Sequence, residues 1–362
     1  MSLIRIGLDE AGLGPTLGPL VIGGFATRER ANERAKKTVA RGPERDSLRE
    51  RLASIVAEPP CRDGRIEVGD SKAIHQGARK LARLERTALA TIVWMHGELP
   101  ASVGELFDLV LVREFERAGD RRAPWWRALD EALPLVCDRG EILELGAKLR
   151  EVGEREGVEP LWYRADLIDA ARVNRELDEE HLRAGGTKNT WSTHAVLRMA
   201  DLAWRELAVR GAERRAGSRT SVACDMAGGR RAYVPALRRG FGLASEHDQG
   251  ALFEAAQAGT IQVLGEAREA SRYRLALAGG ELELGFFVGG DRLDPRISWG
   301  SILAKYLREL LLRPFNRYFA DEVAGLRATA GYPEDARRFI ADVEAVLGPD
   351  AGLERAMWIR SK

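Results

Sequence analysis

Two adjacent carboxylates, Asp9 and Glu10, stand at the end of a short aliphatic run that begins at Leu3. Gly12 and Gly14 follow within a few positions, which is typical of a tight turn. If the run is a strand, the two carboxylates point to opposite faces, and on a central strand one of them is buried at a high cost unless a partner neutralises it. The pair therefore indicates a metal site, a base partner or the edge of a cleft, while a strand-end acid beside a solvated turn explains it equally well.

Two later extended runs, 220–225 and 281–288, also have an acidic residue at or just after their end. The first ends at Asp225, and the second is followed closely by Asp291. If these strands lie beside the first one, four carboxylates meet at one rim, and that much negative charge requires divalent cations. Ligand sets made of oxygen alone favour Mg²⁺ or Mn²⁺ over zinc, and two such ions can support phosphodiester hydrolysis.

Asp70, Ser71 and Lys72 form a third polar group that could do chemistry. They follow a short extended run at 65–69 and precede residues with a helical period. Free backbone amides at a helix start, with a lysine beside them, can hold a phosphate. An ordinary helix cap by Asp70 or Ser71 explains the same residues without a ligand.

The overall charge gives no indication of an acidic partner, because the 362 residues carry a net charge of only +1. Any contact with nucleic acid must therefore come from local basic groups. One such group follows Asp225, although solvated surface is the simpler explanation for its last two members. Its residues are Arg230, Arg231, Arg238 and Arg239.

The elements that must position these groups are strands and helices in alternation. Gly279 and Gly280 join two extended runs as a hairpin. A helix at 191–207 is expected to be capped by Ser192 or Thr193. Further strands are expected at 3–11 and 20–24, and further helices from about 71 to 92, from about 297 to 314 and around 339–347.

Residues from about 97 to 186 differ in character from the rest. Their apolar residues have helical spacing and show few strand signals, which predicts a mostly helical insertion. We expect this insertion to form a cap beside the acidic rim and to select the shape of the substrate. The three cysteines are far apart and suit a reducing cytosol, and the sequence contains no apolar run long enough to span a bilayer. A cytoplasmic protein without a membrane partner is therefore expected.

The motifs, taken in order, resemble the type 2 ribonucleases H (ribonuclease HII). The resemblance covers nearly the whole chain apart from insertions, and its closest part joins the last acid to the helix start that follows it. The matching motifs are Gly7–Pro15, Gly69–Lys72, Val222–Asp225, Gly290–Asp291 with Ile297–Ser298, Ser301–Lys305 and Gly331–Pro333.

The resemblance implies a ribonuclease H-like α/β fold, a mixed β-sheet flanked by helices, with residues 1–96 and 187–362 as the catalytic domain and 97–186 as the helical insertion. It implies Mg²⁺- or Mn²⁺-dependent cutting of RNA in an RNA–DNA hybrid or in a DNA duplex, where the 2′-hydroxyl distinguishes RNA from DNA. The metal-binding and catalytic acids would be Asp9, Glu10, Asp225 and Asp291. Substrate would be bound by Gly12, Leu13, Gly14, Ser71, Lys72, Lys305, Arg230 and Tyr332.

The sequence departs from the family pattern at several positions. Leu13 stands where the family commonly has an arginine between the glycines, so one phosphate contact is lost. Arg337 stands where a histidine is usual, and Glu309 where an aspartate is usual. The stretch from Asp225 to Asp291 is also longer than in compact members.

These departures leave two alternatives to a hybrid-cutting nuclease. One is a catalytically weak nucleic-acid-binding protein that keeps the fold and the metal but holds its ligand with the insertion and the arginine group. The other is a nuclease with a different nucleic-acid substrate, such as branched DNA. Members of one fold can change substrate, so the resemblance does not decide among the three.

Overall fold

The computed structural model describes residues 2–30, 47–113, 123–127, 129–183, 186–209, 219–226, 229–243, 259–349 and 353–361. Most of the charge-rich run at 28–51 therefore lies outside the described residues. No helix in these ranges is both long enough and apolar enough to cross a membrane.

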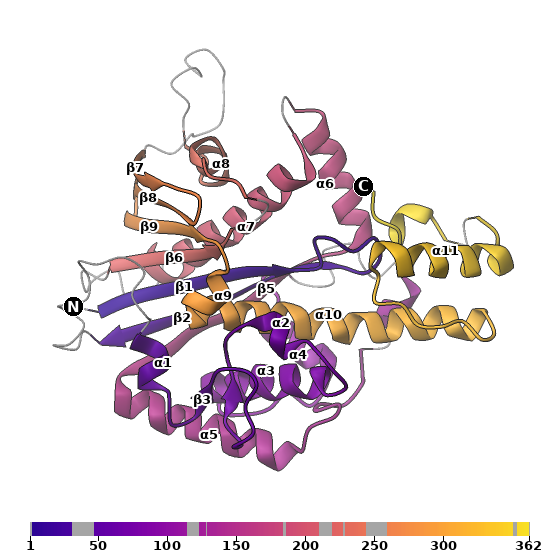
Figure 1. The fold of residues 1–362 in the computed structure, drawn as a ribbon, viewed down its shortest axis with the longest axis horizontal. Helices are drawn as coiled ribbons and strands as arrows, with labels where there is room; N and C mark the ends of the chain where they lie inside the picture. Colours follow the sequence, from indigo (N-terminus) through magenta and orange to yellow (C-terminus); the bar gives the residue numbers. More distant parts are fainter. Residues whose placement is uncertain are drawn as a thin grey trace.

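A seven-stranded mixed sheet forms the centre of the molecule, in the order β5-β2-β1-β6-β9-β8-β7 (Figure 1). The three central strands β1, β6 and β9 are parallel, and every other neighbouring pair is antiparallel. The strands are β1 (Ser2–Ala11), β2 (Leu20–Arg30), β5 (Val158–Ile168), β6 (Arg219–Asp225), β7 (Thr260–Glu266), β8 (Ala270–Leu277) and β9 (Gly280–Phe287). Two short strands, β3 (Val56–Ala57) and β4 (Ile66–Glu67), pair separately.

Helices cover both faces of this sheet, as Figure 1 shows. The long helix α10 (Pro295–Glu322) packs on one face together with α3 (Lys80–His96) and α5 (Arg139–Glu156), and α7 (Lys188–Trp204) packs on the other. The fold prediction of a mixed sheet flanked by helices is therefore confirmed. The remaining helices are α1 (Ser47–Arg51), α2 (Ser71–Ile74), α4 (Val103–Val110), α6 (Ala170–His181), α8 (Val234–Gly240), α9 (Gly290–Leu293) and α11 (Pro333–Leu347).

Side chains alternate along β1, so they pack into two different hydrophobic cores, one on each face of the sheet. Ile4, Ile6 and Leu8 are buried in the core on the α7 side. Gly7 faces α10, where a Cβ atom would lie only 2.2 Å from the backbone nitrogen of Ile297. This close approach brings the N-terminal half of α10 onto β1, so the residues that follow Gly7 on the same face lie against that helix.

The segment 97–186 is mostly helical, but it is not a separate unit. It contributes β5, which pairs with β2 at one edge of the sheet, and α5, which packs on α3 within the main core. The sequence did not predict β5, because this strand ends in the continuous buried run Ala165–Ile168. A strand buried on both faces lacks the alternation that distinguishes it from a helix.

Two local predictions also need correction. The helix expected from Ser71 onward is in fact two helices, the short α2 and then α3. The cap of α7 is Thr187 rather than Ser192 or Thr193: its hydroxyl accepts a hydrogen bond from the Thr190 N–H, and the Thr190 side chain bonds back in a capping box.

The hairpin predicted at Gly279 and Gly280 is confirmed as the β8–β9 turn. The edge strand β7 pairs with β8, so two extra strands lie between β6 and β9 in the chain. These strands, together with α8, account for the long separation of Asp225 from Asp291. They extend the sheet at its far edge and leave β6 and β9 as direct neighbours.

Candidate active site

Three parallel strands deliver the predicted acids to one edge of the sheet. Asp9 and Glu10 lie near the end of β1, and Asp225 is the last residue of β6. Asp291 lies just beyond β9, in the first turn of α9. Because β1, β6 and β9 are parallel neighbours, their carboxyl ends meet at the same edge, as the sequence predicted.

The turn after β9 connects Asp225 to the segment that carries Asp291. The backbone N–H of Gly290 donates to Oδ1 of Asp225 over 2.7 Å. Gly289 has a left-handed φ of +64°, which reverses the chain between the strand and α9. The turn thus holds the ends of β6 and β9 together by a hydrogen bond to a carboxylate.

Ser71 holds Asp291 in place. Its backbone N–H and its hydroxyl both donate to Oδ2 of Asp291, at 3.0 and 2.8 Å. Ser71, predicted as a phosphate contact, is buried and already engaged with this acid. Lys72 beside it is exposed and can reach solvent or a ligand.

The cap predicted at the start of this segment is observed. Oδ1 of Asp70 accepts hydrogen bonds from the backbone N–H groups of Lys72 and Ala73, at 3.0 and 3.4 Å. The preceding residue, Gly69, is clamped to α10, because Oγ of Ser298 accepts from its N–H and donates to its carbonyl. The short helix α2 is therefore fixed against the N-terminal part of α10.

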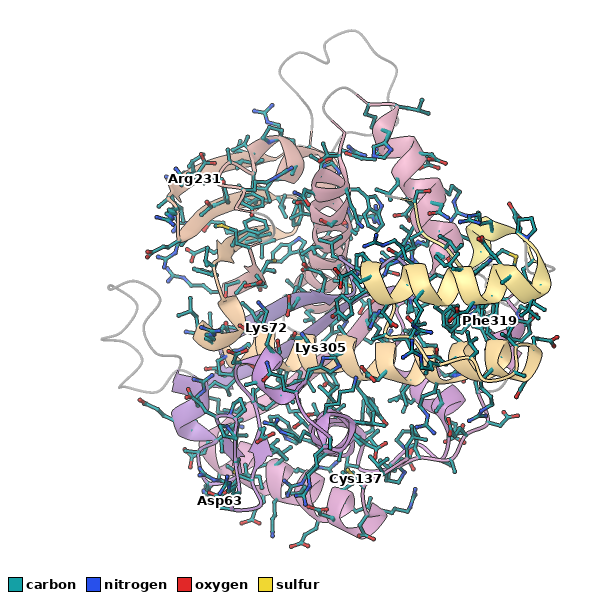
Figure 2. All side chains as sticks on the ribbon, turned by 45° about the vertical axis from the view of Figure 1, so that its right-hand side comes forward. Asp63, Lys72, Cys137, Arg231, Lys305 and Phe319 are labelled. Atoms are coloured by element: carbon teal, nitrogen blue, oxygen red, sulfur yellow. The ribbon has the colours of Figure 1, made fainter. Side chains whose placement is uncertain are left out.

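Lys305 provides a cation next to the acids. Its Nζ donates to Oγ of Ser71 over 3.0 Å and also to the hydroxyl of Ser301, one turn earlier on α10. Figure 2 shows Lys305 on α10 and Lys72 on the facing α2. Burial raises the pKa of both Asp9 and Glu10, and the positive charge of Lys305 opposes that rise, which places Lys305 within electrostatic reach of each.

The carboxylates repel one another strongly. Burial, with the charges of Asp9 and Asp225, raises the pKa of Glu10 to about 8. Burial and the charge of Asp9 raise the pKa of Asp225 to about 6, and burial also raises the pKa of Asp9. Without cations the site therefore retains protons near neutral pH, because one lysine does not balance the acids.

A hard divalent cation suits this donor set, since carboxylate oxygens are the ligands that Mg²⁺ and Mn²⁺ prefer. Within the described ranges, however, no three His, Cys, Asp or Glu side chains converge closely enough to hold an ion. Two of the acids direct oxygens to Gly290 and Ser71 instead. The residues thus fit the chemistry and the charge of a metal site. They would hold an ion through Asp9, Glu10, Asp225 and Asp291.

The glycine loop after β1 meets the Gly331–Tyr332 turn. The N–H of Thr16 donates to the carbonyl of Gly331 over 2.7 Å, which joins the two segments. Tyr332 is 52% exposed, and Gly14 is exposed with open space around it. Leu13, in contrast, packs partly against the core on the α7 side. The structure therefore joins the glycine loop to the Gly331–Tyr332 turn through Thr16, with Gly14 and Tyr332 exposed and Leu13 turned partly inward.

The predicted arginine group lies apart from the acids. Arg230 stacks over the ring of Tyr233, with its Cζ atom 5.9 Å from the ring centroid, and no described contact joins it to the four carboxylates. In Figure 2, Arg231 is well separated from Lys72 and Lys305. Arg239 forms an ion pair with the buried Glu180 over 2.7 Å. At least Arg239 therefore has a structural partner.

Sequence reasoning missed a second polar contact with α10, made by the residue after α2 and the first residue of α3. Glu309 accepts from Lys80 over 2.8 Å and lies 2.7 Å from Nε2 of His75. Glu309 therefore lies one turn beyond Lys305 and pairs with structural partners. The spacing of Ser301, Lys305 and Glu309 by four residues could have indicated that they share one helix face.

No family model and no curated protein matches this sequence. Solved structures do match. The chain is similar to ribonucleases HII and HIII along nearly its whole length. RNase HII from Archaeoglobus fulgidus, solved with PCNA, is 12% identical, with 99% of this chain and 98% of that chain covered and a TM-score of 0.36.

Two further structures are similar at the same level. Ribonuclease H2 from Pyrococcus horikoshii OT3 is 14% identical, with coverage of 98% and 93% and a TM-score of 0.41. Bst-RNase HIII in complex with Mn²⁺ is 11% identical, with 99% of this chain and 66% of that chain covered and a TM-score of 0.38. At these low identities, the chemistry of the site has to be judged from its own geometry.

Proposed function

We propose that this protein is a divalent-metal-dependent endonuclease that hydrolyses the RNA strand of RNA–DNA hybrids, or ribonucleotides embedded in DNA, by a two-metal mechanism. The observation that supports this proposal is the position of Asp9, Glu10, Asp225 and Asp291 at the carboxyl ends of three adjacent parallel strands. Bound Mg²⁺ or Mn²⁺ would relieve the repulsion among these carboxylates.

The roles of the individual residues follow from their positions. The four acids would hold the ions, which would supply an activated water and stabilise the leaving oxygen. Lys305, fixed by Ser71 and Ser301, offsets part of the negative charge so that the polyanionic substrate can approach. Ser71 orients Asp291 through two hydrogen bonds, so it acts as a positioning residue.

The choice of RNA as substrate rests on the sequence motifs. The backbone around Gly12 and Gly14 would approach the ribose, and the exposed Tyr332 lies on the turn that Thr16 joins to this loop. A 2′-hydroxyl at that point would distinguish RNA from DNA. The exposed Lys72 at the start of α2 would contact backbone phosphate.

Cleavage assays test this proposal directly. The substrates are a duplex with one ribonucleotide, a full RNA–DNA hybrid, an all-DNA duplex and an all-RNA duplex, each with Mg²⁺, Mn²⁺ or chelator. We expect cutting only where RNA pairs with DNA and only with metal. The Asp9→Asn variant should bind but not cut. The Asp63→Asn variant is the matched control, because Asp63 is exposed and pairs locally with Arg65.

Other outcomes would contradict the proposal in distinguishable ways. Metal-dependent cutting of an all-DNA or branched substrate would indicate a nuclease with a different substrate. Binding that is unaffected by Asp9→Asn, together with no cutting of any substrate by the wild-type protein, would indicate a nucleic-acid-binding protein. Equal rates on the hybrid and on the single-ribonucleotide duplex would agree with the proposal and would show no preference for the RNA–DNA junction in a protein with Leu13.

A further inference from the structure

The sheet continues past β9 with the strands β8 and β7, and one face of this extension is covered. Tyr233, at the start of α8, stacks on Phe286 of β9, with ring centroids 3.6 Å apart. The opposite face is open to solvent: Gln262 of β7 is exposed, and the side chains of the ion pair Arg274 and Glu283 are 40% and 51% exposed. Figure 1 shows α10, which covers this side of β1 and β2, running away from β7, β8 and β9.

Phe287 adds an aromatic ring to this open face, next to the acidic edge. It is the last residue of β9 and pairs with Asp225, the last residue of β6, so the two side chains leave the sheet on the same face. The ring lies back along its own strand over Gly285, where an added Cβ atom would be 2.6 Å from its Cζ atom. The glycine therefore lets the ring lie low on the sheet.

Arg272 of the neighbouring strand β8 lies against this ring. It is the register partner of Gly285, and its Cζ atom is 5.5 Å from the centroid of the Phe287 ring. A guanidinium against an aromatic ring makes a surface that is both apolar and cationic. We call Phe287 and Arg272 the β8–β9 shelf. Both residues are partly exposed, so a ligand can reach them.

The shelf is positive where it meets the acidic edge. Among the described residues, no carboxylate forms an ion pair with Arg272. The acids that β9 adds to this face, Glu281 and Glu283, lie near the start of the strand, and Glu283 is about 13 Å from Phe287 along it. The β7–β8 turn carries one arginine and one glutamate, both exposed, which offset each other. The half of the face beside the catalytic acids therefore combines an aromatic ring with an unpaired positive charge.

A surface of this kind suits an unpaired nucleotide. Bases stack on aromatic rings and on arginine guanidinium planes, and only a base outside a duplex has a free face for such stacking. The phosphate of the same nucleotide complements the charge of Arg272. A double helix would present base edges and phosphates here and would leave the ring of Phe287 unused.

We propose that the β8–β9 shelf binds a single-stranded segment of nucleic acid that continues from the duplex held at the acidic edge. A base of this segment stacks on Phe287 and Arg272, and the strand continues over the open face of β7, β8 and β9. The inference rests on the proposed function and narrows its substrate class to a hybrid that adjoins a single strand. The shelf acts in binding and not in the chemical step.

The test compares tailed and blunt substrates. Affinity is measured with Mg²⁺, in the Asp9→Asn protein, for a labelled blunt RNA–DNA hybrid and for the same hybrid with a DNA tail of about 10 nucleotides at one end or the other. We expect a tail on at least one end to strengthen binding about tenfold. Phe287→Leu, which keeps an apolar side chain over Gly285, should abolish this gain without changing the affinity for the blunt hybrid. Arg272→Gln should reduce the gain.

The matched controls are Tyr318→Leu and Arg155→Gln. Tyr318 is a half-buried aromatic residue about 20 Å from Lys305 along α10, and Arg155 is a half-exposed arginine on α5. Both variants should keep the gain from the tail. The gain is a ratio of two affinities measured on the same protein, so a general loss of stability does not imitate its disappearance.

A second measurement needs no substitution at the shelf. A tail that carries iodouracil is irradiated in complex with the Asp9→Asn protein, and the crosslinked peptide is identified by mass spectrometry. Crosslinks within β8 or β9 are expected. Crosslinks only elsewhere, a tail that adds no affinity at either end, or an equal gain in Phe287→Leu and Tyr318→Leu would each overturn the inference.

The outcomes separate this inference from the proposed function. Metal-dependent cutting of the blunt hybrid by the wild-type protein, with no gain in affinity from a tail, would leave the function in place and remove the shelf. Tail-dependent binding that is lost in Phe287→Leu, without any cutting by the wild-type protein, would support the shelf and contradict the function. A protein that binds neither substrate would overturn both.

Discussion

The Nζ atom of Lys305 lies 3.0 Å from the hydroxyl of Ser71, a residue far away in the sequence that starts α2. That hydroxyl donates onward to Asp291, so a lysine, a serine and an acid are connected in one chain of hydrogen bonds. The connection explains how the segment 69–72 contributes to the site: it positions charged groups of α9 and α10 relative to each other.

Replacing Ser71 with alanine should therefore reduce activity more than stability. Asp291 would keep its bond to the backbone N–H but lose the hydroxyl, and Lys305 would lose one anchor. We expect the free energy of unfolding to fall by about 1–2 kcal/mol and the cleavage rate to fall on the order of tenfold to a hundredfold. Urea unfolding and single-turnover cleavage measure the two effects.

The control for this change is Ser192→Ala, which removes a buried hydroxyl whose partner, among the described residues, is the carbonyl of Asn189 on its own helix. It should leave the cleavage rate unchanged. Full activity in Ser71→Ala would show that the connection between Lys305 and Asp291 is not needed.

Stability of the metal-free protein should fall as pH rises from about 4 to 8. The folded-state pKa of Glu10 is about 8 against an ordinary 4.5, and that of Asp225 is about 6 against 3.8. In that range the folded protein holds protons that the unfolded chain has released, so raising the pH favours unfolding. Thermal unfolding in EDTA should therefore show a Tm that is several degrees lower at about pH 8 than at about pH 5.

Two further measurements identify the groups that cause this pH dependence of Tm. Glu10→Gln should flatten the pH dependence, whereas Glu144→Gln, at an exposed pair on α5, should not. Saturating Mg²⁺ should raise Tm most at the high end of the range, where the carboxylates are ionised. A Tm of the metal-free protein that rises with pH would contradict the raised pKa values of Glu10 and Asp225.

Gly12 and Gly14 should respond differently to alanine. Gly12 has a φ of +94°, and a Cβ atom there would lie 2.6 Å from the carbonyl oxygen of Pro19. We expect Gly12→Ala to destabilise the protein by about 1–3 kcal/mol. Gly14 has no positive φ and no heavy atom within 4 Å of an added Cβ, so Gly14→Ala should fold normally.

Gly14→Ala also tests the proposed approach of substrate to this loop. The added methyl group would project into the space that the ribose is proposed to occupy, so the KM for the hybrid should rise while Tm stays unchanged. Wild-type kinetics in this variant would place the substrate elsewhere.

At pH values above 4.5, the ordinary pKa of a glutamate, the ionised Glu309 should stabilise the folded protein. Its hydrogen bonds with His75 and Lys80 lower the pKa of its carboxyl to about 2 despite burial. This stabilisation is lost as pH falls from about 4.5 through 2, because the carboxylate is then protonated. Glu309→Gln should therefore lower the free energy of unfolding by about 1–3 kcal/mol at neutral pH.

The difference between Glu309→Gln and the wild-type protein should shrink in urea unfolding at low pH. Glu144→Gln serves as control, because its pair with Lys148 is exposed to solvent and should contribute little to stability. An equal effect of the two substitutions at neutral pH would show that the contacts of Glu309 with α2 and α3 are weak.

Much of the acidic site follows from short-range patterns in the sequence. Asp9, Asp225 and Asp291 each follow an aliphatic run, and such runs predict strands from local residue types alone. The cap by Asp70 and the hairpin at Gly279 and Gly280 are equally local, because each depends on the geometry of a few neighbouring residues. These features could be predicted without knowing which strands are neighbours.

Other features depend on contacts between distant segments, and only the tertiary structure decided them. The burial of β5 on both faces removed the alternation that would have identified it, so its place beside β2 came from the fold. The position of Phe287 beside Asp225, with Arg272 against its ring, joins three separate strands. By itself the sequence determined which residues could do chemistry and in what order. Which of them are neighbours depends on long-range packing, which local periodicity does not encode.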